Sequence, residues 1–161
     1  MLALVRSILR KASLEWEWLV KSPKVRMLSE PNRRIRWITR DQADCLLSGL
    51  HGHVKAMVWF SLETGLRQAK VTGLRWTQID LTRRCAWIHP DQAKARRAIS
   101  VPLSKPAVVI LREQLGKHWT HVFSYKGKPI VQVNSKAWRQ ALQLSGVDSF
   151  KWHDLRHTWA S

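Results

Sequence analysis

The sequence contains few of the residues on which many binding and catalytic sites depend. It has one tyrosine, two cysteines and 11 acidic residues among its 161 positions. Cys45 and Cys85 lack the C-x-x-C spacing of zinc and redox motifs, so we expect neither a disulfide framework nor a metal site. No apolar run approaches the roughly 20 residues that a membrane helix requires. The sequence therefore predicts a cytoplasmic protein that acts away from the membrane.

The shortage of acidic residues leaves a large positive charge. Lysine and arginine number 28, which gives a formal net charge of +17 and a sequence pI near 11.1. The charge is distributed from Arg6 to Arg156 instead of being gathered in a tail, which favours a folded surface that binds nucleic acid. A basic protein of the ribosomal kind is the alternative. Ten tryptophans favour a substantial packed core over that alternative.

Two segments differ in character. Apolar residues recur at helical spacing from about residue 3 to 21, and Ser22-Pro23 ends this pattern. A polar, basic stretch follows as far as residue 38. Thr39 and Gln42 form a capping box that begins the main domain. We therefore expect residues 1–21 to be the last helix of a preceding domain, 22–38 to be a linker, and 39–161 to be one domain.

The main domain alternates helical and strand patterns. The expected elements are helices at 43–50, 54–64, 104–116 and 134–146, a short helical turn at 68–73, and strands at 85–89, 99–103 and 121–123. We expect a turn at His51-Gly52-His53, a helix cap at Asn134, and an edge strand at Pro102, which cannot donate to a neighbouring strand. The predicted fold class is α+β, mainly helical, with a small antiparallel β-hairpin or sheet.

The last residues concentrate donors for an anion. His153, Arg156 and His157 follow i, i+3, i+4 spacing, so one face of a helix presents two imidazoles and a guanidinium, while Leu155 and Trp159 can face the interior. This chemistry suits a phosphate. A solvated amphipathic helix is the commoner interpretation of such a pattern taken alone. A zinc site is disfavoured because a third ligand is missing and Arg156 would repel the metal.

Two upstream groups add cations. The Thr-Gly-Leu-Arg run at 64–67 places Arg67 between a helix end and a helix start, a position suited to anion contact, although an arginine on a surface turn is the alternative. The connection at 90–97 between two strands carries Lys94, Arg96 and Arg97. Cations at the mouth of a hairpin can lie against a DNA backbone, or they can be solvated side chains of an ordinary loop.

In this order and at these spacings, Arg67, Lys94 and the His-Asp-Leu-Arg-His-Thr run at 153–158 resemble the catalytic domain of the tyrosine recombinases, specifically the phage-integrase type. The similarity extends from about Thr39 to Ser161. It implies a tyrosine-recombinase catalytic-domain-like fold for residues 39–161, incomplete at its C-terminus. It also implies that residues 1–21 are the final helix of the family's core-binding domain.

The resemblance implies a role for each matching residue. Arg67 and Arg156 match the two catalytic arginines, which would hold the non-bridging oxygens of the scissile phosphate. Lys94 matches the hairpin lysine that protonates the leaving 5′-oxygen. His153 matches the first position of the H-x-x-R motif, which donates to the phosphate or assists proton transfer. The expected DNA- and phosphate-binding residues are Arg67, Lys94, Arg96, Arg97, Arg156 and His157.

The resemblance also implies the partners. We expect double-stranded DNA and other recombinase protomers, with no small-molecule substrate, in a bacterial or phage-derived protein of the cytoplasm. No metal or cofactor is expected, because in the family the arginines neutralise the developing charge.

Two positions depart from the family pattern. The family usually has an acidic residue three positions after the first arginine, where this chain has Lys70, so we expect Arg67 to be less firmly held. The family's nucleophile is a tyrosine downstream of the H-x-x-R helix, whereas Tyr125 lies upstream in a basic turn. We therefore expect a truncated recombinase that binds DNA and is inactive alone.

Three alternatives stay open from the sequence. A neighbouring protomer could supply the tyrosine in trans, as in some family members, which would make the chain part of an enzyme. The chain could instead be a non-catalytic DNA-binding module or a regulator that competes at recombination sites. It could also be a degraded gene product with no selected role.

Overall fold

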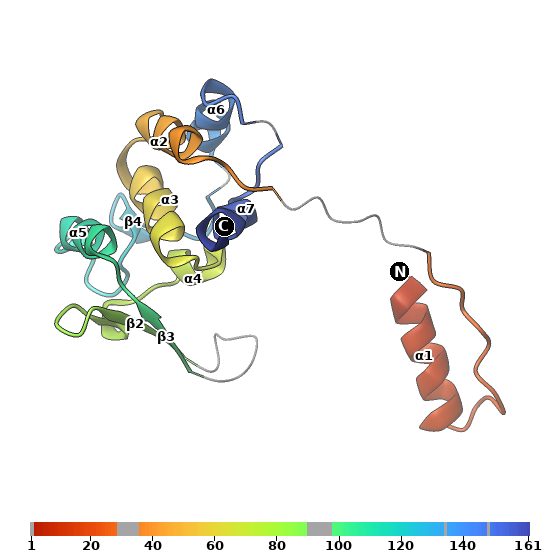
Figure 1. Cartoon of the computed structure of the whole chain (residues 1–161). Helices are drawn as coiled ribbons and strands as arrows, with labels where there is room; N and C mark the ends of the chain where they lie inside the picture. The colour runs from red at the N-terminus through yellow and green to blue at the C-terminus, as the bar shows by residue number, and fades with distance from the viewer. Residues whose placement is uncertain (1, 29–35, 90–97, 134, 148) are drawn as a thin grey trace. The chain divides into compact units, whose positions relative to one another are not determined.

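The structure is a computed structural model that describes residues 2–28, 36–89, 98–133, 135–147 and 149–161. The chain divides into two units, Met1–Arg34 and Ile35–Ser161. Figure 1 shows the elements of both units along the chain. Among the described residues, no helix has both the length and the apolar character needed to cross a membrane.

The first unit contains one helix, α1 (Leu2–Leu14). The expected helix at 3–21 is therefore too long. Glu17 adopts a positive φ of 55°, and the amides of Trp18 and Leu19 return to the carbonyl oxygen of Ala12 at 2.8 and 3.3 Å. The apolar pattern continues past Leu14 because these residues fold back along the helix end instead of extending it.

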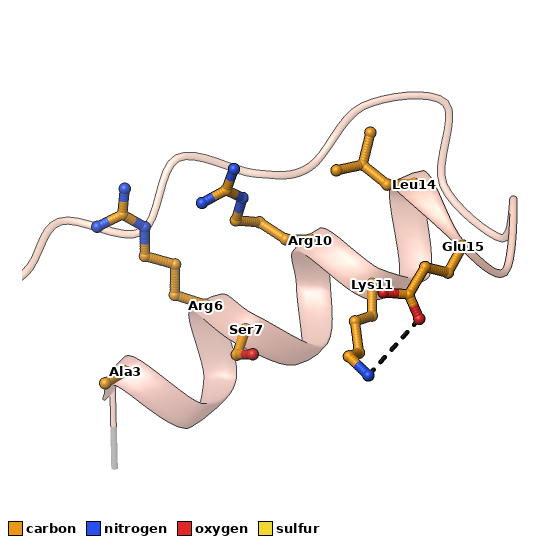
Figure 2. Close-up of a pocket in the computed structure, with 7 residues that line it drawn as sticks. All are labelled: Ala3, Arg6, Ser7, Arg10, Lys11, Leu14 and Glu15. Atoms are coloured by element: carbon orange, nitrogen blue, oxygen red, sulfur yellow. Dashed lines mark ion pairs between the residues drawn. The ribbon is translucent and has the colours of Figure 1, made fainter. Parts of the chain in front are cut away.

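One side of α1 is basic. A hollow of about 460 Å³ lies along it. Figure 2 shows Arg6 and Arg10 extending from the same side of the helix, one turn apart. Lys11 Nζ lies 3.5 Å from a carboxylate oxygen of Glu15, an i,i+4 ion pair on the exposed surface. This hollow belongs to the first unit alone.

The second unit is built on α3. Its helices are α2 (Arg40–Ser48), α3 (Gly52–Thr64), α4 (Gln68–Thr72), α5 (Lys105–Gln114), α6 (Lys136–Leu144) and α7 (Trp152–Ala160). Helix α3 contacts α2, α4, α5 and α7 (Figure 1). Met57, Val58 and Phe60 on α3 are fully buried. A helix that is apolar on several faces is one that other elements surround, which makes α3 the core of this unit.

Most helix ends follow the predicted caps. Thr39 and Gln42 form the expected capping box at α2, and Ser104 Oγ accepts from the Ala107 amide at 3.2 Å at the start of α5. The cap of α6 is Ser135, not Asn134, which lies outside the described residues. The turn expected at 51–53 is also wrong, because Gly52 and His53 already belong to α3.

A three-stranded antiparallel sheet lies beside the helices. Strands β1 (Ile79–Asp80), β2 (Cys85–Ile88) and β3 (Ile99–Pro102) are ordered β1-β2-β3. Pro102 therefore lies on an edge strand, as predicted. The sequence missed β1 because a strand of two residues has no readable alternation. The connection between β2 and β3, with Lys94, Arg96 and Arg97, lies outside the described residues.

A second, two-stranded hairpin consists of β4 (Ser124–Tyr125) and β5 (Lys128–Pro129). The strand expected at 121–123 is replaced there by an isolated bridge between His121 and Arg75. The structure confirms an α+β, mainly helical fold with small antiparallel sheets.

Leu155 tests how strongly α7 depends on the core. It is 0% exposed, so replacing it with alanine should reduce the free energy of unfolding by about 2–5 kcal/mol through lost burial and a residual cavity. Leu144→Ala is the matched control, because Leu144 is 76% exposed and its removal should change stability by less than about 0.5 kcal/mol. Urea unfolding measures both. Equal losses in the two variants would contradict this packing.

Candidate functional site

Helix α7 packs against α3 and presents the histidine and arginine cluster expected from the sequence. The rings of His153 and His157 lie 5.1 Å apart in an edge-to-face arrangement, which confirms that they share one helix face. Leu155 is buried as predicted. Trp159, also expected in the interior, is 52% exposed. The packing of α7 therefore rests on Leu155 and Trp152, while His153 is exposed and Arg156 and His157 are half-buried.

A hydrogen bond joins this cluster to the Thr-Gly-Leu-Arg run. Arg156 Nη1 donates to the carbonyl oxygen of Gly65 at 2.7 Å. Gly65 ends α3 in the left-handed conformation, with φ 62°, and Arg67 is the N-cap of α4. The guanidinium of Arg156 is therefore fixed to the backbone two residues before Arg67, although the two arginines are far apart in sequence.

The pKa of His153 reflects the charges around it, that of Arg67 among them. Partial burial lowers the pKa of His153 from its usual 6.5, and the positive charges of His157, Arg67 and Arg156 lower it further. Asp154 raises this pKa in part. Asp154 also accepts from the Lys151 amide at 2.8 Å, which commits the carboxylate to capping α7. Three predicted site residues, Arg67, His153 and Arg156, thus come together, and His157 lies beside them.

Arg67 is exposed and has no carboxylate partner among the described residues. Lys70, three positions on, cannot supply one. Lys94, Arg96 and Arg97, the other predicted phosphate contacts, lie outside the described residues.

Tyr125 lies elsewhere. Its ring is 4.4 Å from that of His53, in the first turn of α3, whereas Gly65 follows the last turn. A helix of this length spans about 20 Å at 1.5 Å per residue. Tyr125 instead borders a hollow of about 540 Å³ among α3, α5 and β4. The tyrosine is therefore roughly a helix length from the arginine cluster.

Sequence reasoning missed the contacts that hold the cluster in place. Three contacts depend on tertiary packing between distant segments. The Gly65 carbonyl accepts from Arg156, the Trp159 ring covers Gly65, and the Thr158 hydroxyl accepts from the Ile38 amide at 3.3 Å. Only the glycine after α3 gave a signal, because it marked a helix end. Within the described residues, no three His, Cys, Asp or Glu side chains group as metal ligands.

Residues 36–161 match the phage integrase family. The chain belongs to this family. The prediction made from Arg67, Lys94 and the 153–158 run is therefore confirmed at the level of the family.

Curated relatives extend the match to nearly the whole chain. An integrase of Salmonella phage P22 is 39% identical over 99% of this chain and 45% of its own length. A shufflon-specific DNA recombinase of Escherichia coli is 31% identical over 97% of this chain and 40% of its own length. The chain thus spans less than half the length of these curated relatives.

Solved structures share the fold at lower identity. The lambda integrase fragment 75–356, solved as a dimer bound to a COC′ core site, superposes with a TM-score of 0.72 at 18% identity, covering 98% of this chain and 64% of that chain. A XerA recombinase superposes with a TM-score of 0.64, also at 18% identity, over 94% of this chain and 58% of that chain. These similarities show that the fold is that of the integrase family's solved members.

The pKa of His153 gives a test of the cluster. In an NMR titration, His153 should protonate with a midpoint below 6.5. Arg67→Ala should raise the midpoint toward 6.5 without reaching it, because burial and the charges of His157 and Arg156 remain. His53 is the internal control: burial lowers its pKa as well, but its place at the other end of α3 should leave it insensitive to Arg67. A His153 midpoint that ignores Arg67→Ala would contradict the proximity of the two residues.

The same shift predicts the sign of a stability change. Because the unfolded chain binds the His153 proton more readily than the folded chain does, protonation disfavours the folded state. His153 should therefore cost the folded state no stability above pH 6.5. The free energy of unfolding should decline as pH falls from 6.5 through the lowered folded-state pKa of His153. Comparing urea unfolding of wild type and His153→Gln across pH 5 to 8 measures it, since the variant should lose this part of the pH dependence. An identical pH dependence in both proteins would rule it out.

Proposed function

We propose that this chain is the DNA-binding and phosphate-binding part of a site-specific tyrosine recombinase of the integrase type. The observation that carries the proposal is the hydrogen bond from Arg156 to Gly65, which brings the Arg156 guanidinium beside the turn that leads to Arg67. We call the pair of Arg67 and Arg156 the phosphate cradle. Its two guanidinium groups suit the two non-bridging oxygens of a DNA phosphodiester.

Each residue of the proposed site has a distinct task. Arg67 and Arg156 neutralise the charge that builds on the phosphate oxygens in the transition state. His153, neutral near pH 7 because its pKa is lowered, donates an N–H to the phosphate or takes up a proton. Lys94 on the strand connection is proposed as the general acid for the leaving 5′-oxygen. His157 lies against His153 and provides a further phosphate contact.

The proposed partners are duplex DNA and other copies of the recombinase. The net charge of +17 supports a polyanionic partner, and Arg96 and Arg97 add phosphate contacts. The lambda integrase fragment with the same fold was solved as a dimer on its core site. We assign residues 39–161 to the catalytic domain, 22–38 to a basic linker and 1–21 to the end of a core-binding domain.

The nucleophile is proposed to be a tyrosine that is not among these 161 residues. Tyr125 borders a different hollow, at the opposite end of α3 from Gly65. The chain by itself is therefore expected to bind DNA without cleaving it. This same separation favours the second candidate function, a DNA-binding regulator that occupies recombination sites, and the two differ only in whether a tyrosine is supplied from outside these residues.

Binding to duplex DNA tests the cradle. Arg67→Ala and Arg156→Ala should each weaken binding by roughly tenfold or more, because hydrogen bonds to charged groups contribute more than neutral ones. Each lost phosphate contact should also reduce the slope of log K against log salt by about 0.9. Fluorescence anisotropy with a labelled duplex at several salt concentrations measures both quantities.

Arg139→Ala is the charge-matched control for that measurement. Arg139 is exposed on α6, whose contact with α7 is made by the buried rings of Trp138 and Trp152, so removing Arg139 should lower affinity much less. Equal losses for Arg139, Arg67 and Arg156 would mean that general charge, and not the cradle, binds the DNA. Binding independent of salt would oppose both candidate functions.

Covalent trapping tests the position of the nucleophile. With a nicked duplex that captures a phosphotyrosyl intermediate, the 161-residue chain should form no protein–DNA adduct, because Tyr125 is remote from Arg67 and Arg156. Denaturing gel electrophoresis detects an adduct directly. An adduct that disappears in Tyr125→Phe would overturn the assignment of Tyr125 as a non-catalytic residue.

A further inference from the structure

Gly65 is covered by an aromatic ring from α7. A Cβ atom placed on Gly65 would lie only 2.5 Å from Cδ2 and from Cε3 of Trp159, and 3.1 Å from Cγ. The indole therefore lies directly on the backbone of Gly65, with no room for a side chain between them. The positive φ of 62° also makes a side chain at this position strained.

The same peptide is held from a second direction. The carbonyl oxygen of Gly65 accepts the hydrogen bond from Arg156 at 2.7 Å. Arg156 and Trp159 are three residues apart on α7, so both project from neighbouring positions of one helix face. One turn of α7 thus contacts Gly65 through both a guanidinium hydrogen bond and an aromatic ring.

The position of the Gly65 peptide determines the position of the Arg67 backbone. Leu66, between them, is 8% exposed, and Arg67 has extended backbone angles, φ −68° and ψ 151°, before α4 starts. A buried neighbour and a defined helix start leave little freedom between the Gly65 peptide and the Cα atom of Arg67. Since Arg67 has no carboxylate partner among the described residues and Lys70 follows it, its placement relies on the backbone.

Burial does not account for this contact. Trp159 is 52% exposed, whereas Trp152 on the same helix is 7% exposed and belongs to the core. A half-exposed indole on a glycine adds little to the core. Its flat face instead limits how closely the Gly65 peptide can approach α7.

We propose that Trp159 is a positioning residue, which presses on Gly65 and thereby sets the spacing between the guanidinium groups of Arg67 and Arg156. The inference rests on the proposed function, because the spacing matters only if both groups bind one phosphodiester. Trp159 acts through Gly65, and touching the DNA is not its role. Removing its ring lets the turn shift and moves Arg67 away from the phosphate.

A double-mutant cycle with duplex DNA tests the inference. The proteins are wild type, Trp159→Ala, Arg67→Ala and the double variant of the full 161-residue chain, compared at one fixed salt concentration by anisotropy. Trp159→Ala should weaken binding by several-fold to tenfold. In the Arg67→Ala background it should have no further effect, because the residue that it positions is already absent. Effects that multiply in the double variant would overturn the inference and would indicate direct contact between the indole and DNA.

The titration of His153 gives a second readout, which a general loss of stability would not move. Arg67 contributes to the lowered pKa of His153, so a shifted Arg67 should let the NMR midpoint rise in Trp159→Ala. Trp159→Phe keeps an aromatic face on Gly65 and should retain both the wild-type affinity and the wild-type midpoint. An unchanged midpoint in Trp159→Ala would count against the inference.

Trp119→Ala is the matched control. Trp119 is 88% exposed on the segment after α5, and its removal should leave DNA affinity and the His153 midpoint unchanged. A loss of affinity equal to that of Trp159→Ala would overturn the inference, because any exposed tryptophan would then have the same effect. If Trp159→Ala does not fold, as judged by circular dichroism and thermal melting, Trp159→Leu takes its place in the cycle, since it removes the flat ring and keeps an apolar side chain.

The outcomes separate the inference from the proposed function. If Arg67→Ala and Arg156→Ala bind DNA as wild type does, the phosphate cradle itself is wrong, and the role of Trp159 fails with it. If both arginine variants lose affinity while Trp159→Ala keeps it, the cradle stands and only the positioning role is overturned.

Discussion

The hydrogen bond from Arg156 to the Gly65 carbonyl is the contact on which the site depends. It connects the last helix to the turn after the most buried helix, and it brings a second cation close to Arg67. Like charges held in one place repel each other, so the arrangement needs an independent source of stability. The burial of Leu155 and Trp152 against the core provides it, and a bound anion would relieve the repulsion.

This crowding of cations gives His153 its chemical character. Partial burial first, and then the neighbouring positive charges, make a further proton on the imidazole unfavourable. A neutral imidazole retains one N–H donor and one acceptor nitrogen, which suits a group that both contacts a phosphate and moves a proton. If a phosphate diester binds between the arginines as proposed, its negative charge would oppose these shifts and would couple phosphate binding to the protonation of His153.

The arrangement of α3 separates two sets of groups. Gly65 and the arginines lie after its C-terminal end, and His53 with Tyr125 lies at its N-terminal end. Because a helix is a rigid spacer, neither set can approach the other without unfolding the core. The length of α3 therefore separates the arginine cluster from Tyr125.

The sequence alone determined the family, the α+β class, the helix caps at Thr39 and Ser104, and the common face of His153, Arg156 and His157. These features depend on local spacing and on side chains that act on their own backbone. The sequence-based prediction was wrong at three places. Helix α1 ends early because the chain returns to Ala12, and Trp159 covers Gly65 instead of entering the core. Strand β1 was missed because it is too short to show a period. Only the tertiary structure could bring Arg67 to His153 and fix Arg156 on Gly65, because the packing of α7 on α3 sets those distances and no local pattern encodes it.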